Sequence, residues 1–117
     1  MLTKTDSGKV DPAFTITHRR IRQSVMGWCF QPIEVPTLID EMVSIGIEGI
    51  EGIDSKFYPL ATQKGLKIAL VSSHGFAKGP TSRENHDECV AKLRASIDKA
   101  VEFQANRVIT FTGMRVP

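Results

Sequence analysis

The chain has 117 residues, of which 41% are hydrophobic and 24% charged, a composition that suits one globular domain with an ordinary core. Fifteen Lys and Arg against thirteen Asp and Glu leave a net charge of +2. That excess is too small to favour nucleic acid or an acidic membrane surface as a partner. No apolar run approaches the ~18 residues of a membrane-spanning helix.

The first 19 residues lack the apolar core of a secretory signal, and we expect a flexible N-terminal arm over 1–19. A basic cluster closes this arm, and we interpret it as a solvated entry segment, with a phosphate or nucleic-acid contact as the alternative. Its members are His18, Arg19, Arg20 and Arg22. The chain has no CxxC pair, so Cys29 and Cys89 are expected to be buried free thiols of a cytoplasmic protein rather than zinc ligands.

Short apolar runs then alternate with segments of helical periodicity. Each run is nearly continuous in apolar residues, which is typical of strands that are covered on both faces. The expected strands are 21–30, 47–54, 66–75 and 107–113. The expected helices lie between them, at 35–46, 55–65 and 81–106.

The first helix has clear signals at both ends. Pro36 suits the first helical turn, and Gly46 supplies a left-handed end. A second glycine, Gly65, ends the short second helix in the same way. The apolar positions of the first helix recur at helical spacing and are expected to face the core. They are Leu38, Ile39, Met42, Val43 and Ile45.

The third helix is expected to begin at a capping box. Thr81 and Glu84 have the required spacing, and Ser82 is an alternative cap. Asn106 lies where a left-handed residue is needed to end the helix. The predicted core-facing stripe of this helix consists of Val90, Leu93, Ile97 and Val101.

The resulting order, β-α-β-α-β-α-β, predicts an α/β protein with parallel strands and right-handed crossovers. Two architectures fit this order. One is a small doubly wound sheet, and the other is the first four βα units of a (β/α)8 barrel, which normally needs about 250 residues. A doubly wound nucleotide-binding protein usually has a glycine-rich loop after its first strand. The segment WCFQPIEVP at this position has no GxGxxG or GxxxxGKS/T pattern, so nucleotide binding is disfavoured.

In a parallel α/β sheet the functional site lies at the carboxyl ends of the strands. These ends offer aromatic, carboxylate, imidazole and guanidinium groups, which suit a small polyhydroxylated or keto-acid ligand. They are 28–30, 51–54, 72–75 and 112–115. Core packing remains an alternative role for Trp28 and Phe30, and a solvated strand end for Glu51. His74, between an apolar strand and Gly75, is favoured as a site residue.

Five segments, taken together and in order, resemble the N-terminal half of hydroxypyruvate isomerase-like proteins. These proteins belong to the xylose isomerase-like (sugar phosphate isomerase/epimerase) TIM-barrel superfamily. The segments are IRQSVMGWCF, SIGIEGIEGID, GLKIALVSSHG, ENHDECVAKLRASIDKA and RVITFTGMR, between about Arg20 and Arg115. The combination is specific, whereas any one of them alone would be a weak signal.

The resemblance implies a TIM barrel of which residues 20–117 form the first half. It implies an isomerase that converts hydroxypyruvate to 2-hydroxy-3-oxopropanoate by proton transfer through an enediol-like intermediate. In this family two glutamates transfer the proton, and a divalent metal (Mg²⁺ or Mn²⁺), where present, is held by residues of later strands. This chain is therefore expected to supply pocket walls and no metal ligand.

Carried over residue by residue, the resemblance assigns catalytic roles to Glu51 and to His74, the latter as a donor to a substrate oxygen. Arg115 is expected to pair with a carboxylate through two guanidinium N–H groups. The expected ligand is a small hydroxy acid, keto acid or sugar, and neither nucleic acid nor a membrane is an expected partner. The substrate-binding residues implied are Trp28, Phe30, Thr112 and Arg115.

The sequence stops shortly after the fourth expected strand, and we expect part of a longer enzyme that is inactive alone. A half-barrel that forms a homo-oligomer through its open sheet edges, and a self-contained α/β domain, are the alternatives. The competing function is a non-catalytic half-barrel that binds a small polar ligand or only self-associates. A DNA-repair role, known from another branch of the superfamily, requires a basic DNA-binding face and is disfavoured by the net charge of +2.

Overall fold

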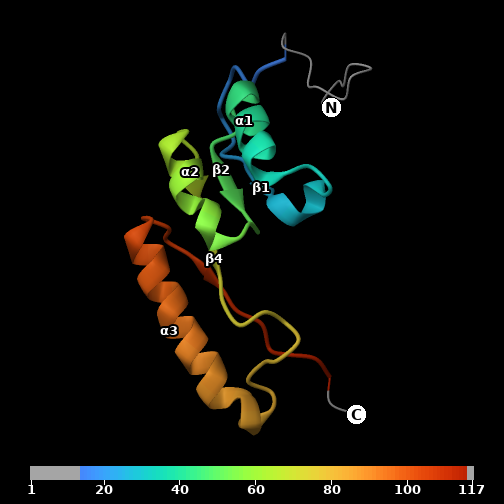
Figure 1. Ribbon diagram of the computed structural model, residues 1–117, viewed down its shortest axis with the longest axis vertical. Helices are drawn as coiled ribbons and strands as arrows, with labels where there is room; N and C mark the ends of the chain where they lie inside the picture. The colour runs from blue at the N-terminus through green and yellow to red at the C-terminus, as the bar shows by residue number, and fades with distance from the viewer. Residues whose placement is uncertain (1–13, 116–117) are drawn as a thin grey trace. The chain divides into compact units, whose positions relative to one another are not determined.

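The computed structural model describes residues 14–115, which form an α/β structure with parallel strand pairs and three α-helices (Figure 1). The predicted α/β class is therefore confirmed. The chain divides into two compact units, one ending at Lys67 and the other beginning at Ile68. None of the helices among residues 14–115 combines the length and the apolar character that crossing a membrane requires.

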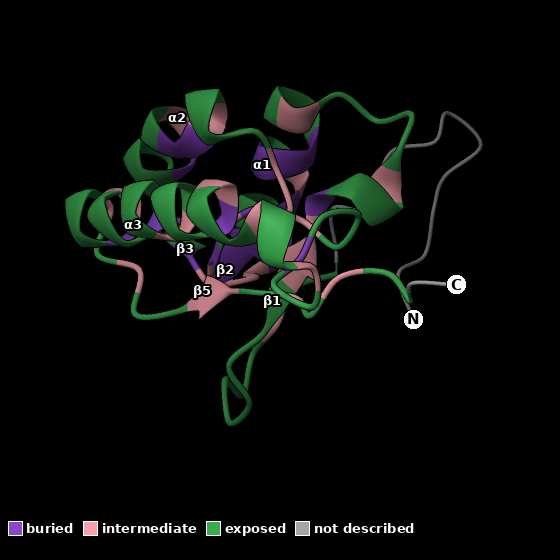
Figure 2. Cartoon of the chain, turned by 90° about the horizontal axis from the view of Figure 1, so that it is seen from below, coloured by how far each residue is buried: buried purple, intermediate pink, exposed green. Residues whose placement is uncertain are grey.

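The first unit is built on a sheet with the strand order β1-β2-β3. Strands β1 (Ser24–Met26) and β2 (Gly49–Glu51) are parallel, with Val25 opposite Ile50, and β3 is Lys67–Ile68. Helices α1 (Val35–Ile45) and α2 (Tyr58–Gln63) connect these strands. The side chains of Leu38, Ile39 and Ile50 are the largest fully buried ones, and Figure 2 shows the buried positions along α1 and β2.

Helix α1 confirms the sequence signals at both of its ends. Pro36 lies in its first turn, and Gly46 ends it with a left-handed φ of +89°. Four of the five predicted core residues are buried, but Val43 is 38% exposed. The buried stripe is therefore narrower than predicted.

The first predicted strand, 21–30, is wrong in its length. Only 24–26 pairs as a strand, and Gly27–Phe30 forms a 3-10 turn, η1. The backbone approaches so closely at Gly27 that a Cβ there would overlap the side chain of Ile53 and lie 3.2 Å from the carbonyl oxygen of Gly52. A run of apolar residues cannot distinguish a strand from such a turn.

The third predicted strand, 66–75, is interrupted. It divides into β3 and β4 (Val71–Ser72), which belong to different sheets, and Ala69 and Leu70 lie between them. The boundary between the two units lies within β3, between Lys67 and Ile68, just before this interruption. The continuous apolar run contains no glycine or proline that would predict this interruption.

The second unit pairs β4 in parallel with β5 (Val108–Ile109), so that Val71 lies opposite Val108. Helix α3 (His86–Glu102) connects the two strands. Its Ser96 hydroxyl donates to the carbonyl oxygen of Ser72, at 2.9 Å, and also to that of Lys92, at 2.8 Å. A buried hydroxyl group therefore ties the helix to the strand.

The predicted start and end of α3 are both wrong. A 3-10 turn, η3 (Arg83–Asn85), precedes the helix, and neither Ser82 nor Asn85 makes a side-chain capping bond. The backbone N–H of Thr81 instead donates to the carbonyl oxygen of Thr112, at 3.0 Å. The left-handed residue at the other end is Gln104, with φ +57°, rather than Asn106.

The predicted core-facing stripe of α3 is also wrong. Val90, Ile97 and Val101 are 47, 52 and 75% exposed. The buried residues of the helix are small: Cys89, Ser96 and Ala100. Both cysteines are free, as expected. Cys89 is buried, which confirms its prediction, but Cys29 lies exposed in η1, so the predicted burial of Cys29 is wrong.

Candidate functional site

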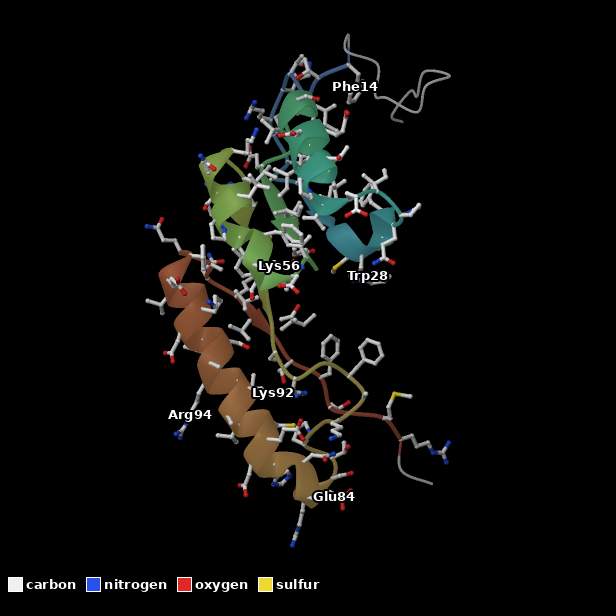
Figure 3. The ribbon with its side chains drawn as sticks, viewed as in Figure 1. Phe14, Trp28, Lys56, Glu84, Lys92 and Arg94 are labelled. Carbon is white, nitrogen blue, oxygen red and sulfur yellow. The ribbon has the colours of Figure 1, made fainter. Side chains whose placement is uncertain are left out.

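A pocket in the first unit lies beside the carboxyl ends of β1 and β2. Its volume is about 390 Å³, within the range of small-molecule sites. Trp28 projects from η1 at this place and is 63% exposed (Figure 3). The lining residues are Gly27, Trp28, Gln31, Pro32, Ile33, Glu34, Val35, Gly52, Ile53 and Asp54.

The indole of Trp28 is positioned by close packing over Gly52. That glycine has a φ of +63°, and a Cβ there would overlap the sulfur of Met26 and lie 2.9 Å from Cδ1 of Trp28. A residue with a Cβ is therefore excluded at position 52, both by the left-handed backbone and by the overlap with neighbouring side chains. Trp28 is therefore a wall of this pocket, and burial in the core does not account for it.

Three polar residues line the pocket beside Trp28, and the sequence marked the segment of only one of them. Gln31 and Glu34 follow the unpredicted turn η1, and Asp54 follows β2. The Asp54 carboxylate accepts the backbone N–H of Lys56 at 2.9 Å and so caps the turn η2 (Ser55–Phe57). Asp54 belonged to a strand end that the sequence did mark, whereas no sequence signal pointed to Gln31 or Glu34.

Tyr58, the first residue of α2, is a buried titratable group that interacts electrostatically with Asp54. Its side chain is 3% exposed. Burial raises the pKa of the Tyr58 hydroxyl above its ordinary value, and the negative charge of Asp54 raises it further. The folded chain therefore holds the phenol proton more tightly than the unfolded chain does.

Phe30 and Glu51 do not line the pocket with Trp28. Phe30 is the last residue of η1 and is half-buried. Glu51 is the last residue of β2, half-buried, and paired in register with Met26. Of the three site residues predicted in the first unit, only Trp28 lines this pocket.

In the second unit His74 follows β4 and is 9% exposed. Its Nδ1 lies 3.0 Å from the carbonyl oxygen of Lys78, and its Nε2 lies 2.8 Å from Oγ1 of Thr110. A carbonyl oxygen only accepts, so Nδ1 carries the proton; in the neutral ring Nε2 then accepts from the Thr110 hydroxyl. The imidazole thus links the chain after β4 to the chain after β5.

Two more contacts hold these strand ends together. The Ser73 hydroxyl donates to the carbonyl oxygen of Ile109 at 2.5 Å. Gly79 packs directly on the backbone of the other strand end, where a Cβ would overlap the carbonyl oxygen of Thr112 and the nitrogen of Gly113. The loop after β4 is therefore fixed against the loop after β5 by sterics as well as by hydrogen bonds.

Thr112 and Arg115 are both exposed. The Thr112 hydroxyl donates to the carbonyl oxygen of Gly113, at 3.5 Å. Among residues 14–115, no ion pair includes Arg115. Nearby, Phe76 stacks edge-on against Phe111 with ring centroids 5.6 Å apart. This aromatic pair was not predicted as part of the site.

The observed hydrogen bonds of His74 limit its predicted role as a donor to a substrate oxygen. Both of its ring nitrogens already have partners within the second unit. A substrate oxygen would accept a hydrogen bond from Nε2 only if it replaced the Thr110 hydroxyl and the ring carried a proton on Nε2. His74 as described is therefore a positioning group for the strand ends, and its catalytic role stays a prediction.

No protein-family model, curated protein or solved structure matches this chain. Within the part of the chain that the structure describes, no three or more His, Cys, Asp or Glu side chains are grouped so that they could hold a metal ion.

Proposed function

We propose that this chain forms the first four βα units of a TIM barrel and contributes substrate-pocket walls to an isomerase of the hydroxypyruvate isomerase type. One observation carries this proposal. In each unit, candidate residues follow the carboxyl ends of a parallel strand pair, Trp28 and Asp54 after β1 and β2, and His74 and Arg115 after β4 and β5. Parallel α/β folds place their active sites at these ends.

The proposed reaction moves one proton between neighbouring carbons. A base removes a proton from C3 of hydroxypyruvate while the C2 carbonyl oxygen gains one, which gives the enediol; C2 is then protonated and the C3 hydroxyl loses its proton, which gives the aldehyde. Arg115 is the predicted partner of a substrate carboxylate, and Trp28 forms an apolar wall of the pocket in the first unit. Both proton-transferring glutamates are expected outside this chain, and Glu51 and His74 stay predicted catalytic residues.

The single tryptophan of the chain offers a direct test. Hydroxypyruvate titrated to millimolar concentration should change the fluorescence of Trp28, and Gln31→Ala, in the lining of the same pocket, should weaken the apparent affinity by about fivefold. Gln63→Ala, at an exposed position of α2 outside the pocket, is the matched control and should leave the affinity unchanged. The chain alone should not isomerise hydroxypyruvate. Absence of any fluorescence change, or turnover by the chain alone without added metal, would exclude the proposal.

A non-catalytic, self-associating half-barrel is the second candidate function. The observation that favours it is the apolar surface of α3, where Ile97 is 52% and Val101 75% exposed. Such a surface is typical of a helix that packs against a further element. Sedimentation velocity should then show a dimer that Val101→Lys converts to a monomer, and a monomeric wild-type chain at all concentrations would exclude it.

A further inference from the structure

A second pocket of the first unit lies at the opposite ends of the strands, where β1, β2 and β3 begin. Its volume is about 620 Å³. Arg22 precedes β1, Glu48 precedes β2, and Lys67 opens β3, so this pocket gathers the starts of three strands. Arg19 and Lys64 complete the charged groups of its lining.

The pocket is strongly basic compared with the whole chain. Four basic side chains face one carboxylate, Glu48, an excess of three positive charges, whereas the whole chain has a net charge of +2. Lys64 also pairs with Asp40, at 3.1 Å. Among residues 14–115, no ion pair includes Arg19, Arg22 or Lys67. These three cations are therefore available to an external anion.

Stabilisation of helix C-termini is the ordinary reason for basic residues here, because α1 and α2 both end at this pocket. The last carbonyl groups, however, already accept backbone N–H groups. In α1, Met42 accepts from Ile47 at 3.0 Å; in α2, Ala61 accepts from Leu66 at 2.9 Å and Thr62 from Gly65 at 3.1 Å. Because backbone groups cap both helices, Arg19, Arg22 and Lys67 are not required for capping, whereas the ammonium group of Lys64 pairs with Asp40.

Arg19 adds an independent observation, because its backbone is in the left-handed region with φ +43°. A residue with a Cβ rarely adopts this conformation, and such strained positions concentrate at binding sites. One terminal nitrogen of its guanidinium, Nη2, lies 3.6 Å from the position that a Cβ on Gly46 would take. The strained backbone thus holds the guanidinium close against the turn that lines the pocket.

We propose that this pocket binds a small phosphate-bearing anion. Two guanidinium groups provide paired N–H donors that fit phosphate oxygens, and two ammonium groups add point charges. The pocket volume lies within the range of small-molecule sites. The sequence pointed to part of this site through the basic cluster, of which Arg19 and Arg22 line the pocket, but Lys64 and Lys67 join them only in the folded chain.

Calorimetric titration of the whole chain with sodium tripolyphosphate at low ionic strength tests the proposal. We expect one-to-one binding that Lys67→Gln or Arg22→Gln weakens about fivefold, and that Glu48→Gln strengthens by a similar factor. Arg94→Gln, which removes an exposed charge from α3, should leave the dissociation constant unchanged (Figure 3). Raising the salt concentration to about 0.3 M should weaken the binding of all variants.

Separate titrations with ATP and with a short single-stranded oligonucleotide identify the source of the phosphate. Equal affinity for tripolyphosphate and ATP indicates that the phosphates alone are recognised, and tighter binding of ATP indicates that the organic part contributes; both support the proposal. Three results overturn it: no binding of tripolyphosphate, equal weakening by Arg94→Gln and Lys67→Gln, or binding of the oligonucleotide that is much tighter than that of ATP. Circular dichroism of each variant verifies that the fold is retained.

Discussion

The two units of the chain differ in the interactions that stabilise each of them internally. In the first unit the largest buried side chains are apolar, with Leu38, Ile39 and Ile50 at 1% exposure or less. The second unit also buries apolar side chains, among them Ile68 and Val71, each 3% exposed, but its buried residues include the polar His74 and Ser96, and large apolar residues of α3 are exposed. The first unit thus has an apolar core beside an open pocket, whereas the second combines a smaller apolar core with hydrogen bonds that join its strand ends.

This difference changes how the candidate residues of each unit are interpreted. Trp28 in the first unit is exposed over a cavity and is free to contact a ligand. His74 in the second unit is engaged on both ring nitrogens and acts on the positions of its neighbours. Similar places at strand ends therefore supply a wall in one unit and a structural tie in the other.

The largest expected effect comes from the core of the first unit. Ile50→Ala removes a fully buried side chain and should lower the free energy of unfolding by about 2–5 kcal/mol. Val101→Ala, on the exposed surface of α3, should change it by less than about 0.5 kcal/mol. Urea denaturation followed by circular dichroism measures both, and equal effects would contradict the assigned difference between the units.

The next effect concerns the glycines of the second unit. Gly79→Ala places a Cβ on the backbone at Thr112 and should cost about 1–3 kcal/mol. Gly75→Ala is the matched control, since a Cβ there meets open space and only the left-handed backbone, with φ +75°, opposes it. It should cost about 1 kcal/mol. A greater loss at Gly75 than at Gly79 would contradict the close approach of the two loops.

A smaller effect is expected at the hydrogen bond between His74 and Thr110. Thr110→Val removes the hydroxyl group and leaves Nε2 without its partner, which should cost about 1–2 kcal/mol. In a double-mutant cycle with His74→Phe, the two losses should be less than additive because they remove the same bond. Strict additivity would show that the two side chains do not interact.

The smallest effect is a dependence of stability on alkaline pH. Burial, followed by the charge of Asp54, raises the pKa of Tyr58 in the folded state. The folded state therefore holds this proton more tightly, and its contribution to stability is complete below the ordinary pKa of about 10.0. It is lost as pH rises through the raised value. Tyr58→Phe should have a flatter profile than the wild type above pH ~10, and parallel profiles would contradict this assignment.

The sequence predicted those elements that have local steric signals. Pro36 and Gly46 bound α1 correctly because each restricts the backbone at its own position. The buried face of α3 was not predictable from hydrophobicity, because small residues such as Ser96 and Ala100 pack against the strands while Val101 remains exposed. The break at Ala69 and Leu70 depends on strand pairing rather than on either residue.

The candidate site was predictable to a similar degree. Strand ends led to Trp28 and to the segment that contains Asp54, and both line the pocket. Glu34 was missed because the chain turns through η1 after Met26, and an apolar run does not reveal that turn. The two hydrogen bonds of His74 are made to Lys78, four residues away in the sequence, and to Thr110, 36 residues away. These groups come together around the imidazole only in the folded chain.

The central claim, that this chain supplies the first half of an isomerase barrel, is tested most directly by reading the source DNA through codon 117 and beyond. The account predicts that the frame continues for roughly 130–150 codons, with further strand–helix units that carry the proton-transferring glutamates. A stop codon directly after Pro117 would contradict the half-barrel enzyme for this product.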